Sequence, residues 1–345
     1  MTKKLKVKKK SRLVFSLIVI AIFILAGFGI FAAYLGSENM PVSAGNSEII
    51  SIEIPKGIST EKIASILDGK KLIRSVLVFK LKSKIEGYDA TYKSGFYSLS
   101  QSMSMEEIMI QLRKGTTSAL RFTIPEGFDI KKITERLANE KLINPTNFLR
   151  QIEQGSFDYK FLRDAPAGNE RLEGYLYPDT YEVFPNSSEK KILDKMLSRF
   201  NQVFTEEYYA RAKELGMSVG EVLTLASIIE REAKIPGDRP LISSVFHNRL
   251  SLKMPLQSCA TVQFVLGDQK AKLTNKDIAI DSPYNTYIVA GLPPGPICSP
   301  GLASIKAALY PSDTKFLYFL AKGDGSSVFS VTYKDFLKNK AKYIN

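Results

Sequence analysis

Tryptophan is absent from this 345-residue sequence, and histidine and cysteine are rare: His247, Cys259 and Cys298 are their sole representatives. Two cysteines cannot form the disulfide framework of a small secreted domain, and a single histidine leaves little room for a histidine-rich metal site. His247 occurs in a helix-like segment and is interpreted as structural. Because metal-ligand spacings and phosphate-binding loops are also missing, we expect neither a metal nor a cofactor. Acid–base chemistry should therefore depend on carboxylates, tyrosines and lysines.

The composition is that of a globular protein, with 44% hydrophobic and 24% charged residues, and the length allows two domains. The net charge is +13, but residues 1–12 hold seven cations and no acid. The remaining 333 residues therefore carry only +6. A nucleic-acid-binding protein usually spreads its cations along one face, so no nucleic-acid partner is expected.

Residues 13–35 form an uncharged, strongly apolar run that follows this basic tail. A helix of that length crosses a hydrocarbon layer of about 30 Å, and the basic side stays in the cytoplasm. The alternative is a cleaved signal peptide, whose apolar core is shorter. We expect a single-pass anchor in the cell membrane, with the later residues outside the cytoplasm. There, Cys259 and Cys298 could form a disulfide or remain two separate thiols, and the sequence leaves both open.

The outer part contains a repeat. Ile54-Pro55-Lys56-Gly57 returns as Ile124-Pro125-Glu126-Gly127, and apolar matches continue beyond it. Each copy is interpreted as a strand, a turn and a helix. The copies are either a duplicated folding unit with no site of its own, favoured for the second, or a polymer-binding module like the LysM modules. The predicted segments are a cytoplasmic tail (1–12), a membrane helix (13–35), a linker (36–48), a LysM-like module (49–118) and a catalytic domain (119–345).

The rest of the chain favours an α+β fold of mixed helices and hairpins. Helices are expected over about 188–215 and 219–234, and a long loop rich in Gly, Pro and Asn over 281–301. Strands are expected over 316–320 and 328–332, joined by a Gly-Asp-Gly turn, with a helical tail from Tyr333.

Glu230 is the strongest candidate for catalysis. It follows the apolar run 222–229 of a helix whose start is marked by the capping-box residues Ser218 and Glu221. A carboxyl group beside apolar walls has a raised pKa, so it can hold a proton at neutral pH and donate it. The alternative is an ordinary ion pair with Arg231 or Lys234.

Candidate substrate-binding residues fall into three further groups. Alternating tyrosines and polar groups suit sugar rings, which have one apolar face and a rim of hydroxyls. For Tyr175 and Tyr177 the alternative, which is slightly favoured, is a tyrosine-rich strand packed on the core. The residues are Glu173, Tyr177, Asp179, Thr180 and Tyr181; Gln257 and Ser258; and Tyr284, Asn285 and Thr286.

With these motifs assembled, the chain resembles the endolytic murein transglycosylases of the YceG-like family. The resemblance runs from the membrane segment almost to the carboxyl terminus. It rests on Leu172-Glu173-Gly174-Tyr175-Leu176-Tyr177-Pro178-Asp179-Thr180-Tyr181, Leu225-Ala226-Ser227-Ile228-Ile229-Glu230, Asn248-Arg249-Leu250, Ser282-Pro283-Tyr284-Asn285-Thr286-Tyr287 and Gly291-Leu292-Pro293-Pro294-Gly295-Pro296-Ile297.

The resemblance implies a membrane-anchored enzyme that cuts nascent peptidoglycan strands internally, with Glu230 as the acid/base. One carboxyl would protonate the oxygen of the MurNAc–GlcNAc β-1,4 bond and then take the proton of the MurNAc 6-hydroxyl, leaving 1,6-anhydro-MurNAc ends. Ordinary glycosidases need a second carboxylate, for which Glu173 is the candidate if the reaction is hydrolysis. Cell-wall synthases and division or elongation proteins are the implied partners.

Two departures from the family pattern give weight to a different reading. Cys259-Ala260 replaces the usual Asp-Pro after Leu-Gln-Ser, and Ser327 stands where a His is common. These two departures put in doubt the contacts that segments 257–261 and 325–329 would make with the substrate in the family. The alternative function is therefore a catalytically silent peptidoglycan-binding scaffold of the cell-wall synthesis machinery.

Overall fold

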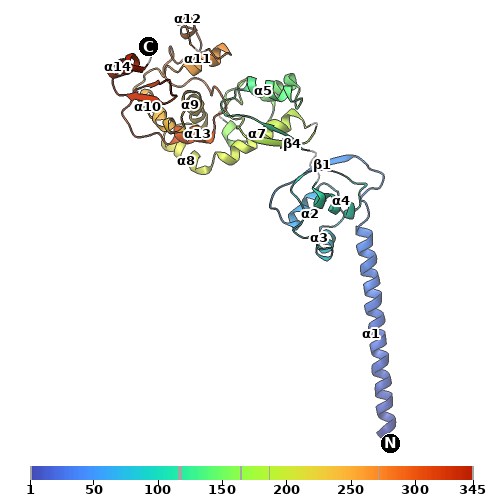
Figure 1. The fold of residues 1–345 in the computed structure, drawn as a ribbon. Coiled ribbons are helices and arrows are strands. Elements are labelled where there is room, and N and C mark those ends of the chain that lie inside the picture. Colours follow the sequence, from blue (N-terminus) through green and yellow to red (C-terminus); the bar gives the residue numbers. More distant parts are fainter. Residues whose placement is uncertain (1, 116–118, 164, 186, 271, 344–345) are drawn as a thin grey trace. The chain divides into compact units, whose positions relative to one another are not determined.

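The computed structural model describes residues 2–115, 119–163, 165–185, 187–270 and 272–343, in which helices and strands alternate irregularly (Figure 1). It divides into two compact units, Met1–Leu120 and Arg121–Asn345. Each unit has its own hydrophobic core. The mixture of helices with small sheets agrees with the mixed α and β class that the sequence predicts.

The amino-terminal helix, α1 (Thr2–Glu38), carries the apolar run. Its segment Val19–Glu38 has a mean hydropathy of 2.4 and is not buried by the rest of the protein. It is long and apolar enough to cross a membrane, as the sequence predicts, whereas the orientation of the chain in a membrane stays a prediction.

The rest of the first unit is built around an antiparallel pair of strands. Ile52 of the first strand lies opposite Tyr97 of the second, and the helices bury Leu67, Phe79 and Met109 against them. Its elements are β1 (Ile49–Ile54), α2 (Thr60–Gly69), α3 (Val76–Ile85), β2 (Gly95–Ser100) and α4 (Met105–Lys114). The likeness to LysM modules stays a prediction.

The sequence repeat is also a structural repeat. Both turns use a glycine with φ of 78°, Gly57 and Gly127, and both following helices begin at a side-chain cap, Ser59 or Asp129. The second copy consists of β3 (Leu120–Thr123), α5 (Ile130–Asn139) and α6 (Pro145–Gln154), and β3 pairs with the later strand β4 (Thr180–Val183). Glycine suits this turn because φ is positive there.

The second unit surrounds one buried helix, α9 (Val219–Glu232), at whose start the predicted capping box is present. Residues 222–229 of α9 are all buried. In Figure 1 the helix lies among its neighbours. Those neighbours are α8 (Glu206–Glu214), α10 (Arg239–Ser251), α11 (Cys259–Leu266) and α13 (Leu302–Leu309). The remaining elements are η1 (Lys160–Leu162), α7 (Glu189–Val203), η2 (Pro236–Asp238), α12 (Asn275–Ile278), β5 (Tyr318–Ala321), β6 (Ser327–Ser330) and α14 (Tyr333–Tyr343).

Three local predictions need adjustment. The helix expected over 188–215 is two helices, α7 and α8, because the backbone turns at Phe204. The strand reading of Tyr175 and Tyr177 is wrong: both are buried, but Tyr175 lies in a turn and Tyr177 in an irregular segment ahead of β4. Helices α11 and α13 were not expected. The hairpin of β5 and β6 and the carboxyl-terminal helix are confirmed.

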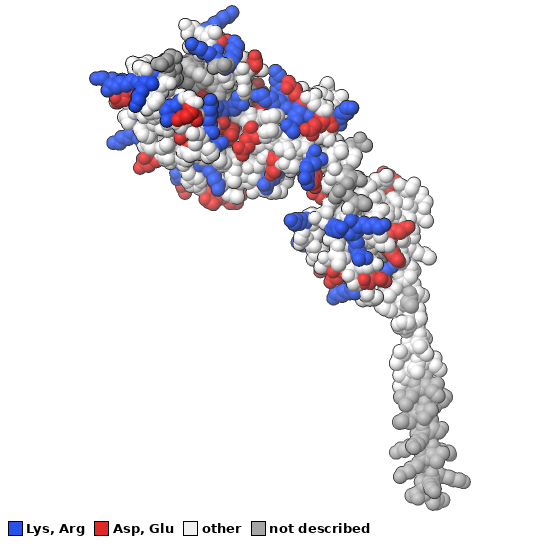
Figure 2. All heavy atoms as spheres, viewed as in Figure 1, with Lys and Arg blue, Asp and Glu red and all other residues white. Residues whose placement is uncertain are grey.

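The surface agrees with the modest charge of the outer part. On the face shown in Figure 2, basic and acidic side chains are intermixed over both units, without a single basic stripe.

Candidate active site

Glu230 lies near the carboxyl end of α9, with its side chain only 8% exposed. Its Oε2 atom accepts hydrogen bonds from the backbone N–H of Gly301, at 3.1 Å, and from the hydroxyl of Ser304, at 2.7 Å. Both donors belong to the first turn of α13, where free N–H groups and the helix dipole favour an anion. The carboxylate is therefore held in one orientation by a second helix.

Arg239, at the start of α10, completes this environment. Its Nη2 atom lies 3.5 Å from Oε1 of Glu230, and its Nε donates to the hydroxyl of Ser304 at 3.1 Å. The ion pair thus forms with Arg239, and not with the predicted partners Arg231 or Lys234. The apolar walls expected around this carboxyl are likewise replaced by hydrogen-bond donors and a guanidinium.

The small residues before Glu230 allow a loop to approach α9. The hydroxyl of Ser227 accepts the N–H of Ile297 at 3.0 Å, and Cys298 contacts the Ser227 carbonyl. On its other side the loop exchanges backbone hydrogen bonds with the repeat turn, from Gly127 N to Ser299 O at 2.9 Å and from Ser299 N to Phe128 O at 2.8 Å. The glycine- and proline-rich loop therefore joins α9 to the second repeat copy.

Glu126, in that repeat turn, is a second carboxyl group at this site, and the sequence reasoning did not select it. It lies against Gly301: a Cβ atom on this glycine would be 1.9 Å from Oε1 of Glu126. Partial burial and the charge of Glu230 raise its pKa, against the opposing influence of Arg239. The two carboxyl groups thus approach one glycine, one at its N–H and one at its Cα.

Tyr177 is the residue of the tyrosine motif that reaches this site. Burial is the main cause that raises the pKa of its hydroxyl, Arg199 opposes this, and Glu126 is among the charges that raise it further. The other motif residues support the turn: Tyr181 donates to the Tyr177 carbonyl, Asp179 pairs with Arg199, and the Thr180 hydroxyl bonds to that of Thr123.

Glu173 lies elsewhere. It is 3% exposed, and its oxygens accept the N–H groups of Ile130, at 2.9 Å, and Gly174, at 3.2 Å. Burial raises its pKa to about 8, against the lowering effect of those two donors. This carboxyl therefore binds the first turn of α5, and it also lines a cavity of about 500 Å³ with Tyr284 and Glu170.

The other predicted binding residues mostly hold segments together. Ser258 donates to the half-buried carboxylate of Glu232, and its N–H donates to the hydroxyl of Thr286. The amide of Asn285, which is fully buried, donates to two backbone carbonyls of its own loop. Tyr284 donates to Glu170 at 2.9 Å. Gln257 is exposed and has a φ of 51°.

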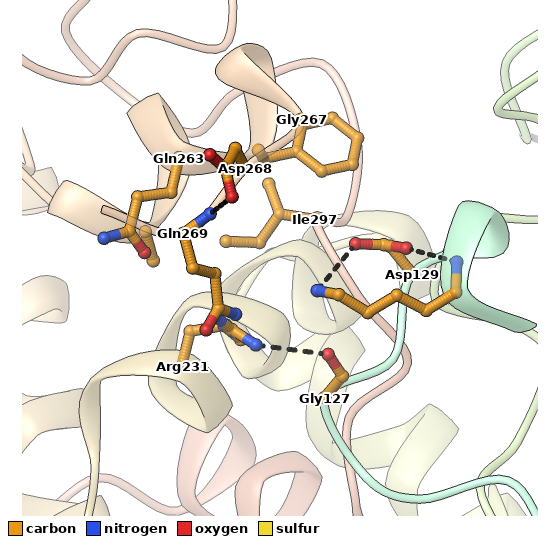
Figure 3. A pocket seen from close by; sticks show the side chains of 11 residues that line it. Gly127, Asp129, Arg231, Gln263, Gly267, Asp268, Gln269 and Ile297 are labelled. Carbon is orange, nitrogen blue, oxygen red and sulfur yellow. Dashed lines mark hydrogen bonds and ion pairs between the residues drawn. The ribbon is translucent and has the colours of Figure 1, made fainter. Parts of the chain in front are cut away.

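A hollow beside the site could receive part of a long substrate. It has a volume of about 290 Å³ and is lined by polar and charged groups together with Ala260, Phe264 and Ile297. Arg231 donates to the carbonyl of Gly127 at 3.4 Å, and the side chain of Gln269 extends toward Arg231 (Figure 3). Gly127 connects the hollow to the carboxyl site, since a Cβ atom there would lie 3.9 Å from Cγ of Glu230.

The sulfur and histidine groups stay outside this arrangement. Both cysteines are free thiols, Cys259 exposed and Cys298 buried, so the two-thiol alternative holds. His247 contacts the carbonyl of Ala308 at 2.9 Å, and burial lowers its pKa, in agreement with a structural role. Among the described residues, no group of acidic, histidine or cysteine side chains could hold a metal ion.

Comparison with known proteins gives consistent matches. The model of the YceG-like family matches residues 52–342. A Bacillus subtilis protein named endolytic murein transglycosylase is 37% identical over 317 residues, which cover 88% of each chain. A Streptococcus pneumoniae protein of the same name is 30% identical over 340 residues, covering 90% of this chain but 61% of that protein.

A solved structure agrees. The crystal structure of a YceG-like protein from Listeria monocytogenes superposes with a TM-score of 0.58 at 35% identity, covering 84% of this chain and 98% of that one. The family match spans parts of both units and the positions of Glu126 and Glu230. The chain belongs to the YceG-like family.

Proposed function

We propose that this protein is an endolytic peptidoglycan lytic transglycosylase. It cleaves the MurNAc–GlcNAc β-1,4 bond of nascent glycan strands, leaves 1,6-anhydro-MurNAc ends and so limits strand elongation. The observation that carries the proposal is the Glu230 carboxylate, fixed by Gly301, Ser304 and Arg239 beside an open polar hollow. The relatives named endolytic murein transglycosylase support the substrate class.

The chemistry follows from what a fixed carboxylate can do. Glu230 accepts the proton of the MurNAc 6-hydroxyl as this oxygen attacks C1 of its own ring, and an acid protonates the departing oxygen. Because the nucleophile belongs to the substrate, no carboxylate is needed to hold water. Glu173 is poorly suited to that task, since backbone N–H groups occupy both of its oxygens.

The location of the enzyme is also a proposal. The basic residues 1–12 stay in the cytoplasm, the apolar part of α1 crosses the cell membrane, and both folded units work outside the cytoplasm. This arrangement brings the site to newly made strands, next to cell-wall synthases and to division or elongation proteins, which are the proposed partners.

The test is product analysis on un-crosslinked glycan strands by mass spectrometry. Wild-type protein should generate anhydro ends, and Glu230→Gln should reduce their formation by at least about 10²-fold, because one proton transfer is lost. Glu214→Gln, which alters an exposed carboxylate on α8, is the matched control and should behave as wild type. Unchanged strands would instead indicate a catalytically silent scaffold, and reducing ends would indicate hydrolysis.

A further inference from the structure

Two carboxyl groups meet at Gly301, and they differ in what surrounds them. Glu230 comes from the end of α9, and Glu126 comes from the turn between β3 and α5. The first accepts the Gly301 N–H at 3.1 Å, and the second occupies the space that a side chain on residue 301 would fill. The absence of a side chain at this position is thus what lets Glu126 come close.

The hydrogen-bond donors are divided unequally between them. Glu230 has three, the Gly301 N–H, the Ser304 hydroxyl and the Arg239 guanidinium, so its oxygens act as hydrogen-bond acceptors. Glu126 is exposed, and among the described residues no hydrogen bond or ion pair to it is found. The negative charge of Glu230 opposes ionisation of Glu126 and the positive charge of Arg239 favours it, and the net direction is a raised pKa.

We propose that Glu126 is a second catalytic residue, the general acid, and that Glu230 serves as the base. This inference rests on the proposed function and refines it, because the two proton transfers are divided between two groups. The direction of the Glu126 pKa, raised by partial burial and by Glu230, is consistent with it.

The reaction balances without another reactant. Glu126 donates its proton to the glycosidic oxygen as the bond from C1 to that oxygen breaks. The MurNAc O6 forms a bond to C1 and passes its proton to Glu230. Glu126 is then charged and Glu230 neutral, and transfer of one proton between them, directly or through solvent, restores the starting state. Pairs of carboxyl groups with opposite protonation recur in enzymes that cleave glycosides.

Tyr177 adds a positioning element. Its hydroxyl lies close enough to Glu126 for the charge of Glu126 to raise its pKa. Because Tyr181 holds the Tyr177 backbone and β4 pairs with β3, the tyrosine motif and the repeat turn form one support for Glu126. The tyrosine motif therefore helps to position Glu126, whereas the sequence suggested that it contacts sugars.

The decisive experiment compares two substrates. One is an un-crosslinked glycan strand, and the other is a short glycan whose terminal MurNAc carries 4-nitrophenoxide, a leaving group that departs without a proton. Glu126→Gln should lose at least about 10²-fold on the strand, the usual size of a general-acid contribution. It should lose less than about tenfold on the nitrophenyl glycoside. Glu230→Gln should lose strongly on both, since the base is needed in each reaction.

The pH profile gives an independent readout. On strands, wild-type activity should fall as pH rises through the pKa of Glu126, because the acid must be protonated. With the nitrophenyl glycoside this alkaline limb should weaken. Glu182→Gln, on the strand β4 beside β3, is the matched control: its ion pair with Arg121 is exposed, so neither activity nor profile should change.

The outcomes separate this inference from the proposed function. Equal losses of Glu126→Gln on both substrates, with native circular dichroism, would assign it a structural role and overturn the inference. Full activity of that variant on strands would overturn it as well, while anhydro ends from wild-type protein would keep the proposed function. If wild-type protein formed no anhydro ends, the proposed function would fall, and this inference with it.

Discussion

Replacing Gly301 with alanine tests the site by steric means, without changing any ionisable group. The new Cβ atom would lie 1.9 Å from Oε1 and 2.1 Å from Cδ of Glu126. To reach an ordinary contact of 3.4 Å, the carboxyl group must retreat by about 1.5 Å. Displacements of about 1 Å at catalytic groups can cost on the order of 10²-fold in rate, so Gly301→Ala should lose roughly that much.

The fold should tolerate this change. Gly301 has φ of −77° and ψ of 167°, which alanine adopts without strain, and the colliding group is the end of a flexible, solvent-accessible side chain. The N–H that binds Glu230 is retained. Gly301 is the N-cap of α13, where alanine is disfavoured, so the free energy of unfolding should fall by only about 1 kcal/mol. Thermal unfolding measures this loss of stability, and the rate of anhydro-end formation measures the loss of activity.

A double-mutant cycle identifies the cause of the loss. If Gly301→Ala acts by displacing Glu126, it should have little further effect in a Glu126→Ala background, where the colliding atoms are gone. The double variant should then be about as active as Glu126→Ala alone. Losses that multiply would show that Gly301 acts through something else, and the reasoning about this contact would be refuted.

Two further predictions concern groups away from the carboxyl pair. Folding raises the pKa of Glu173 from 4.5 to about 8, so its contribution to stability is complete below pH 4.5 and is lost as pH rises through 8. Urea unfolding between pH 5 and 8 should show the free energy falling by up to about 1.4 kcal/mol per pH unit, and Glu173→Gln should flatten this slope; an unchanged slope would contradict the assignment. Ellman's reagent should detect one thiol, Cys259, in the native protein and a second, Cys298, only after unfolding. Two native thiols, or none after unfolding without a reductant, would contradict this.

Features encoded within one segment could be predicted from the sequence. The capping box of Ser218 and Glu221 marks the start of α9, because both groups lie within one turn. The repeated Pro-Gly turn was recognisable because the same backbone needs a glycine at the same place twice. Glu230 could be selected as a candidate for a similar reason, since it directly follows the apolar run of its own helix; its catalytic role stays a prediction.

The surroundings of Glu230 could not be predicted in the same way. Its donors come from α13 and α10, whose approach is decided by packing around α9 and not by local pattern. The expectation of apolar walls considered only the residues of α9. Glu126 was not selected because its position in the site depends on contact with Gly301. Gly301 is distant in the sequence and looks there like any other loop glycine.

The repeat shows how the same backbone can serve two purposes. The equivalent of Glu126 in the first copy is Lys56; both are exposed, each follows a strand of its repeat copy, and each precedes a glycine with φ of 78°. We expected the second copy to lack a site of its own, yet its turn is the one that meets Gly301 and pairs with Ser299. The turn geometry is therefore a matter of folding, common to both copies. The chemistry depends on the side chain that the turn presents and on the neighbour that it meets, and only in the second copy is a carboxyl group brought beside the fixed charge of Glu230.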